Sequence, residues 1–249
     1  MTKLRPLITI PCLLLGMLLF AGIPQAQTRP ATVEQLAKTY GLDSYGQIEA
    51  LRYTFNLELP ALKVSLSRTW TWEPKTGKVT YESKDKDGQP VKVSYNRNQL
   101  NSAPANVKDD IEPAFVNDNY WALFPFHVFW DTSANVTEKD KQKLPIGAGT
   151  AKLLSVKYGA EVGGYTPGDT WDLYIGKDGR VAQFIYRRGG PKKPSNVTTT
   201  WAGYKMAGPL LFSTDHRGTA DGKPARIFFT NVAVKVTGSD TWMDATPAK

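Results

Sequence analysis

A strict alternation of side chains between residues 170 and 188 constrains the fold of this chain more than any other feature. Trp171, Leu173 and Ile175 alternate with Thr, Asp and Tyr, which is the pattern of a strand with one buried face. A Gly-Lys-Asp-Gly loop follows, and Phe184 and Tyr186 then share one face of the returning run. The pattern predicts an antiparallel hairpin.

The same period of two recurs along most of the chain. It is clearest at 51–59 and 64–72, and it returns at 79–81, 91–95, 152–158, 197–201 and 228–236, with a further short strand through Leu211. The positions opposite the apolar ones are rich in Ser and Thr, as expected of a sheet that is solvated on one face. We expect about ten antiparallel strands, because no strands alternate with long helices as a parallel sheet would require.

Residues 104–130 interrupt the β pattern. Positions 107–118 have helical spacing, and Pro113 predicts that a helix begins or bends there. Seven of the 11 residues from Tyr120 to Trp130 are aromatic when His127 is counted. Such a density must be buried or must form a binding surface. Two interpretations are open: a fixed plug across the open side of a curved sheet, or a mobile lid over a cavity.

Three shorter segments have simpler interpretations. Thr32 to Tyr40 is predicted to be an amphipathic helix that Thr32 caps and Gly41 ends. Lys139 to Lys143 is predicted to be a solvated linker, and the tail after Gly238 is predicted to fray, with Trp242 as a tether.

The first 26 residues have the composition of a secretory signal peptide. Lys3 and Arg5 precede an apolar run from Leu7 to Ile23, and Ala26 supplies a small residue at the expected cleavage point. Cys12 lies in the middle of that run after Pro11, which excludes lipidation there. We therefore expect a cleaved, periplasmic or secreted protein comprising residues 27–249 as one domain, without cysteine and hence without disulfides.

The charge balance and the chemical motifs say less about function than the strand pattern says about the fold. Without Lys3 and Arg5 the chain has 29 basic and 23 acidic residues, and its densest basic cluster is Arg187, Arg188, Lys192 and Lys193. Nucleic acid is not expected as a partner of an exported chain that has no binding motif. The two histidines, His127 and His216, lack the spacing of a metal site, so we expect neither a metal nor another cofactor. An exported hydrolase of glycan or ester using Asp169, Asp172 or Asp215 with His216 remains an alternative.

Three segments together resemble a known family. They are Trp70-Thr71-Trp72, Asn119-Tyr120-Trp121 with Pro125-Phe126, and Gly164 to Asp169. Their order resembles a family of uncharacterised exported bacterial proteins whose fold is similar to that of the lipoprotein carriers LolA and LolB. The resemblance implies a mostly β, α+β fold: a curved antiparallel sheet forming an incomplete barrel, with short helices over its concave face. In those carriers the concavity receives acyl chains.

These observations favour an exported, non-catalytic protein that binds an apolar or lipid-like molecule in the concavity of a half-barrel. A structural envelope protein that binds a protein partner is a further alternative, and contact with the membrane is expected to be transient. The expected ligand-binding residues are large aromatics from the strands and the insertion: Tyr53, Phe55, Trp70, Trp72, Trp121, Phe124, Phe126, Phe129 and Trp171.

Overall fold

The computed structural model describes residues 29–160, 167–190 and 193–248. The predicted signal peptide, residues 1–26, lies outside these ranges. Within them, none of the helices combines the length and the apolar character that crossing a bilayer requires.

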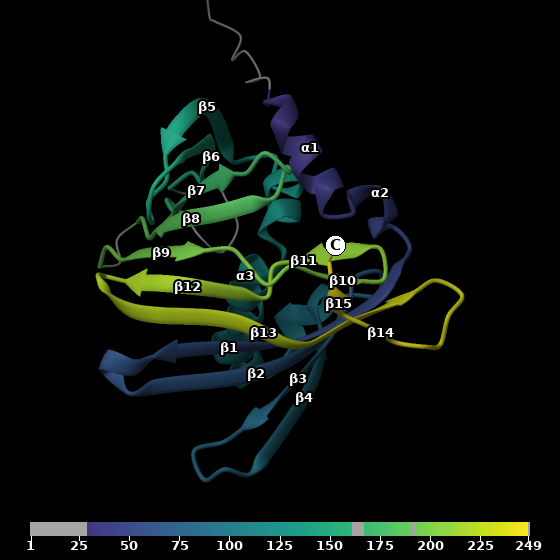
Figure 1. Ribbon diagram of the computed structural model, residues 1–249. Helices are drawn as coiled ribbons and strands as arrows, with labels where there is room; N and C mark the ends of the chain where they lie inside the picture. The colour runs from purple at the N-terminus through teal and green to yellow at the C-terminus, as the bar shows by residue number, and fades with distance from the viewer. Residues whose placement is uncertain (1–28, 161–166, 191–192, 249) are drawn as a thin grey trace, which may run out of the picture.

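One large antiparallel sheet dominates the molecule (Figure 1). Its strands follow the order β4-β3-β2-β1-β13-β12-β9-β8-β7-β6-β5, and β14 pairs with β13. The strands are β1 (Ile48–Leu59), β2 (Val64–Glu73), β3 (Lys78–Lys84), β4 (Pro90–Asn96), β5 (Asn135–Lys143), β6 (Thr150–Lys157), β7 (Thr170–Ile175), β8 (Val181–Arg187), β9 (Asn196–Thr200), β12 (Asp215–Ala220), β13 (Lys223–Val236) and β14 (Met243–Asp244). The edge strands β4 and β5 do not pair with each other. The sheet is therefore curved but unclosed, which confirms the predicted incomplete barrel.

The long helix α3 (Glu112–Trp130) occupies the concave side of this sheet and connects its two edges. It follows β4 through a 3-10 segment η2 (Arg97–Ser102) and a π-helical turn η3 (Val107–Ile111). Pro113 lies in its first turn, directly after the π-helical turn, as expected of a proline at which a helix begins or bends. The helix kinks at Leu123, two residues before Pro125, where the backbone leaves helical geometry.

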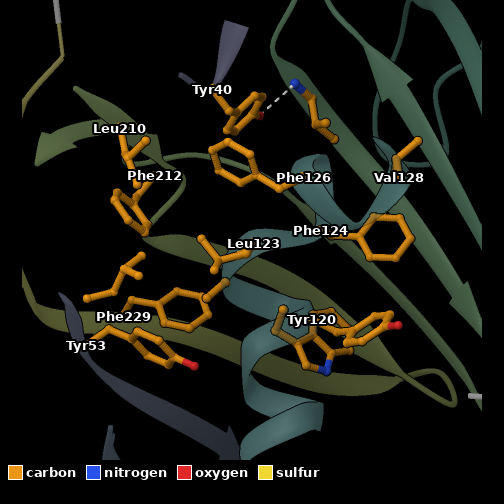
Figure 2. Packing of buried hydrophobic residues seen from close by; sticks show 14 of the residues in the cluster. Tyr40, Tyr53, Tyr120, Leu123, Phe124, Phe126, Val128, Leu210, Phe212 and Phe229 are labelled. Carbon is orange, nitrogen blue, oxygen red and sulfur yellow. Dashed lines mark hydrogen bonds between the residues drawn. The ribbon is translucent and has the colours of Figure 1, made fainter. Parts of the chain in front are cut away.

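Helices α1 (Ala31–Thr39) and α2 (Leu42–Tyr45) close one end of the sheet, beside the turn between β7 and β8. Tyr40, which caps α1, accepts a hydrogen bond at its hydroxyl from the Val181 backbone N–H (Figure 2). Gly41 ends the helix with φ of +104°, and a side chain there would meet the Pro209 carbonyl at 2.4 Å. Thr32 lies inside the helix and not at its N-cap, so that detail of the prediction is wrong.

A small second sheet packs near α1 and α2. It contains β10 (Lys205–Ala207), β11 (Leu210–Phe212) and β15 (Thr246–Pro247). Because β14 and β15 pair with β13 and β10, the predicted fraying of the tail is wrong. The Arg52 guanidinium lies 4.7 Å from the centre of the Trp242 ring, which gives Trp242 the tethering contact that the sequence suggested.

The predicted linker at Lys139 to Lys143 is also wrong, because these residues form the second half of β5. The many charged side chains of this segment are explained by the position of β5 at the edge of the sheet. Lysines on an edge strand discourage pairing with another chain, and so an edge strand can have the composition of a solvated linker.

Candidate functional site

The inner face of the sheet and α3 bury most of the residues that the sequence analysis assigned to ligand binding. Phe124 of α3 stacks on Trp171 of β7 with ring centres 4.2 Å apart. Trp121 meets Trp171 at 5.1 Å and Phe184 at 5.0 Å. The buried members of the predicted set are Tyr53, Phe55, Trp70, Trp121, Phe124, Phe126 and Trp171, each at most 6% exposed.

Figure 2 shows Leu123, Phe124 and Tyr120 of α3 among side chains contributed by the sheet. Tyr53 of β1 and Phe229 of β13 lie nearby, with ring centres 5.9 Å apart. The middle of the concave face is therefore filled by the protein's own helix. A ligand could contact the predicted aromatics there only if α3 moved.

Two predicted residues are less buried: Trp72, which packs against the edge of this core, and Phe129. Trp72 is half-buried and meets Phe115 edge-on, with ring centres 5.8 Å apart. Phe129 is 36% exposed and lines a surface pocket of about 480 Å³ between the start of α1 and the end of α3. The residues lining that pocket are Arg29, Pro30, Ala31, Val33, Glu34, Phe129, Trp130 and Thr132. Since none of them belongs to the sheet, this pocket is separate from the concave face.

A buried ion pair joins the first half of α3 to β2. Asp118 is 0% exposed, and its two carboxylate oxygens accept hydrogen bonds from Arg68 Nε at 2.8 Å and Nη2 at 2.6 Å. Trp70 Nε1 donates to the same carboxylate at 2.8 Å. Burial raises the pKa of Asp118, and the Arg68 guanidinium opposes that shift. The pair fixes where α3 crosses β2.

A second polar cluster fixes the end of α3. Asp131 accepts hydrogen bonds from the hydroxyls of Tyr120 and Tyr158, both at 2.7 Å. The His127 ring stacks on Tyr120 at 3.8 Å and hydrogen-bonds Asn119 at 2.8 Å. Burial alone would raise the pKa of Asp131, but the nearby His127 ring, 3.7 Å away, and the hydrogen bonds from the two tyrosines lower it. His127 thus acts as a packed, hydrogen-bonded ring in the structure.

One part of the inner face is not covered by α3. On β1, Tyr53 and Phe55 are buried, whereas Leu57 and Leu59, which continue the same face toward the end of the strand, are only half-buried. Their partners on β2 are Leu66, which is half-buried, and Val64, which is 40% exposed. On β4, half-buried Val91 and Val93 lie on this face as well. We call Leu57, Leu59, Val64, Leu66, Val91 and Val93 the open-end strip.

The opposite face of the same strands is polar. Asn56 and Glu58 alternate with the strip residues of β1, and Ser65 and Ser67 alternate with those of β2. On β1 and β2 the apolar pattern of the inner face therefore continues past the point where Arg68 and Asp118 hold α3. On β4, Val93 lies in the same cross-strand row as Tyr81 and Trp70. These strip residues were recognised as strand residues from the sequence but not as site residues, because alternation does not reveal where a covering helix stops.

The acidic residues of the hydrolase alternative are all engaged. Asp169 accepts hydrogen bonds from the Tyr186 hydroxyl at 2.8 Å and the Gly189 N–H at 2.7 Å. Asp172 pairs with Arg187 and accepts from Ser155.

Asp215 pairs with Arg217 and Arg226, each at 2.7 Å. His216 is its neighbour on β12, so the two side chains point to opposite faces of the sheet. His216 is 0% exposed, and burial lowers its pKa to about 3. The proposed pairing of Asp215 with His216 as catalytic partners is therefore wrong.

A scan against protein-family models gives no match, and no curated protein matches the sequence. Among solved structures, a DUF1329 family protein from Desulfovibrio piger is similar at 9% identity and a TM-score of 0.44, with 86% of this chain and 96% of that chain covered. A putative outer membrane lipoprotein-sorting protein domain from Vibrio parahaemolyticus is similar at 11% identity and a TM-score of 0.43, covering 84% and 95%. A LolA superfamily protein from Nitrosomonas europaea is similar at 7% identity and a TM-score of 0.42, covering 82% and 93%.

Proposed function

We propose that this protein is an exported binding protein that holds an apolar or lipid-like molecule on the concave face of its sheet, without catalysing a reaction on it. The observation that carries the proposal is the open-end strip, whose side chains are half-buried or exposed, whereas the aromatics further along the same face of β1 and β2 are buried. An apolar sheet face is normally covered, and one left open indicates a binding surface.

The dimensions of the strip suit an acyl chain. From β4 to β1 the distance is three strand spacings, about 14 Å at roughly 4.8 Å each, and Tyr81 and Ser83 of β3 lie between the strip residues of β4 and those of β2. That is close to the acyl layer of one membrane leaflet, about 15 Å if the hydrocarbon core is ~30 Å thick. Each methylene removed from water there would contribute about 0.8 kcal/mol. A handful of methylenes would therefore give measurable binding without any catalytic group.

More specifically, we propose that the protein handles lipid or lipoprotein acyl chains in the cell envelope, as the carriers that its sequence resembles do. The predicted aromatics beneath α3 then act as the floor that supports the helix. They join the binding surface if the helix shifts at its kink.

The test is binding of a fluorescent fatty acid to the mature protein, together with native mass spectrometry after gentle purification. Leu66→Asn is compared with Ser65→Asn, its neighbour on the polar face of β2. Loss of one leucine contact, worth about 1.5–3 kcal/mol when fully buried, predicts an affinity about tenfold weaker for Leu66→Asn and unchanged for Ser65→Asn. A protein that binds no fatty acid and carries no apolar molecule would contradict the proposal, and so would equal effects of the two variants.

A further inference from the structure

We propose that the ligand of the open-end strip is an amphiphile with an anionic head, and that a basic rim at the end of the strip binds this head. The inference rests on the proposed function, which concerns the apolar tail, and adds the chemistry of the ligand's head group. The rim consists of Lys63, Arg188, Lys193 and Lys223, all of which are exposed.

The strand register brings the turns that carry these residues to one end of the sheet. Lys63 stands between the end of β1 and the start of β2, directly beside the strip residue Val64. The start of β13, with Lys223, packs against the Pro60–Leu62 turn. The backbone N–H of Asp221, in the next turn, donates to the Asn196 carbonyl at the start of β9, and Arg188 pairs with Ser195 just before it. Figure 1 shows the turns after β1 and β12 on the same side of the molecule.

The cations of the rim outnumber its acids. Two carboxylates lie close to these cations. Asp169 is buried and accepts from the Gly189 N–H and the Tyr186 hydroxyl, and Asp221 is held by the Asn196 N–H at 2.7 Å and the Ser195 hydroxyl at 3.1 Å. The bonds to Asp221 lower its pKa, and the charges of Arg188 and Lys193 lower it further. Nearby Arg187 and Arg226 are paired with Asp172, Asp215 and Glu58. Among the described residues, no ion pair involves the four rim cations.

Arg188 and Lys63 lie at the two ends of the rim. Arg188 follows Tyr186 by two residues, just after the end of β8, and β13, β12 and β9 lie between β8 and the strip strand β1. Leu62, which is 58% exposed, stands next to Lys63 at the tip of the β1–β2 turn. An apolar wall that ends in cations fits a molecule with an apolar tail and a phosphate or carboxylate head, because such a head forms charge-assisted hydrogen bonds with arginine and lysine.

The experiment compares three probes with the same dodecyl tail, each below its micelle concentration: dodecyl phosphate, dodecyl maltoside and dodecyltrimethylammonium. Binding to the mature protein is measured by isothermal titration calorimetry at low and at moderate salt. We expect dodecyl phosphate to bind at least tenfold more tightly than dodecyl maltoside, with the difference shrinking as salt rises. The cationic probe should bind most weakly.

The variant pair separates the rim from the overall positive charge. Lys63→Gln/Lys223→Gln should remove most of the preference for phosphate and leave the affinity for maltoside unchanged. Lys143→Gln/Lys177→Gln makes the same charge change at the end of the sheet near α1, where β5 and β7 end, and should leave the preference intact.

Equal binding of the phosphate and maltoside probes would overturn the inference while leaving the proposed function standing. If both double variants reduce the preference for phosphate equally, the inference is also overturned, because the preference would then come from the net positive charge of the protein and not from the rim. Binding to phosphatidylglycerol vesicles without binding of monomeric probes would overturn it in favour of a membrane-docking rim. If no probe binds at all, the proposed function fails with it.

Discussion

Asp118 is a fully buried carboxylate on a largely apolar helix, and its charged partner is Arg68. The side chain is 0% exposed, while that of Arg68 is 17% exposed. Buried charges are tolerated when they are paired and hydrogen-bonded, and here both oxygens are engaged. The ion pair therefore fixes the position of α3 more than it adds to overall stability.

Removing one partner of this pair should be costly. We expect Asp118→Leu to lower the free energy of unfolding by roughly 3 kcal/mol, because the Arg68 charge is then left half-buried without its carboxylate. The double variant Arg68→Met/Asp118→Leu should recover most of that loss. Urea unfolding of the three proteins measures the effect, and a double variant no more stable than the single one would contradict this account.

His216 gives the structure a pH dependence of known sign. Its Nε2 lies 3.0 Å from the Ser213 hydroxyl, and its ring stacks on Trp201 at 4.7 Å. Burial lowers its pKa from 6.5 to about 3, although the nearby Asp215 charge acts in the opposite direction. Between these values the unfolded chain binds a proton that the folded protein excludes, so stability is lost as the pH falls below about 6.5.

We expect the free energy of unfolding to fall by roughly 1 kcal/mol for each pH unit below 6 on account of this residue. His216→Phe, which keeps a ring against Trp201, should remove that contribution and leave the contributions of the carboxylates. Chemical unfolding between pH 7 and pH 4 makes the comparison. Parallel curves for the two proteins would show that the histidine does not titrate as the structure implies.

At the scale of one element, α3 is largely apolar and mostly buried, but two of its phenylalanines differ in burial. Phe124 is 0% exposed and stacked on Trp171, whereas Phe129, five positions later, is 36% exposed. Phe126 and Val128, which also follow the kink at Leu123, are 0% exposed. The difference is therefore between two faces of the helix, and Phe129 lies on the face that solvent reaches.

This difference predicts unequal effects of the same substitution. Phe124→Ala should destabilise the protein by about 3–5 kcal/mol, because it leaves a cavity against the sheet. Phe129→Ala should cost less than about 1 kcal/mol, because solvent already reaches that ring. Thermal and urea unfolding of both variants test the packing of α3, and similar losses would mean that the helix does not lie as described.

At the scale of the whole molecule, the alternation of side chains was enough to predict the sheet, because the period of a strand is a local property. The start of α3 at Pro113 and the end of α1 at Gly41 also followed from local backbone chemistry. The charged half of β5 was mistaken for a linker, since an edge strand and a solvated loop share a composition.

The candidate site was only partly predictable. The sequence identified the aromatics of the concave face, but Tyr53, Phe55, Trp70 and Trp171 are covered by the chain's own helix. Which inner residues stay uncovered depends on where Asp118 meets Arg68, a contact between residues 50 positions apart. No local pattern contains that information, and for this reason the open-end strip emerged only from the structure.

The central claim is that an apolar tail lies on the strip of β1, β2 and β4, and photo-crosslinking tests it most directly. A fatty acid with a diazirine near the end of its tail is bound, irradiated and located by peptide mass spectrometry. The account predicts labels on the segments that contain Leu57 to Leu66 and Val91 to Val93, and their loss when unlabelled fatty acid competes. Labels confined to the α1–α3 pocket at Phe129 and Trp130, or to the polar outer face, would contradict it.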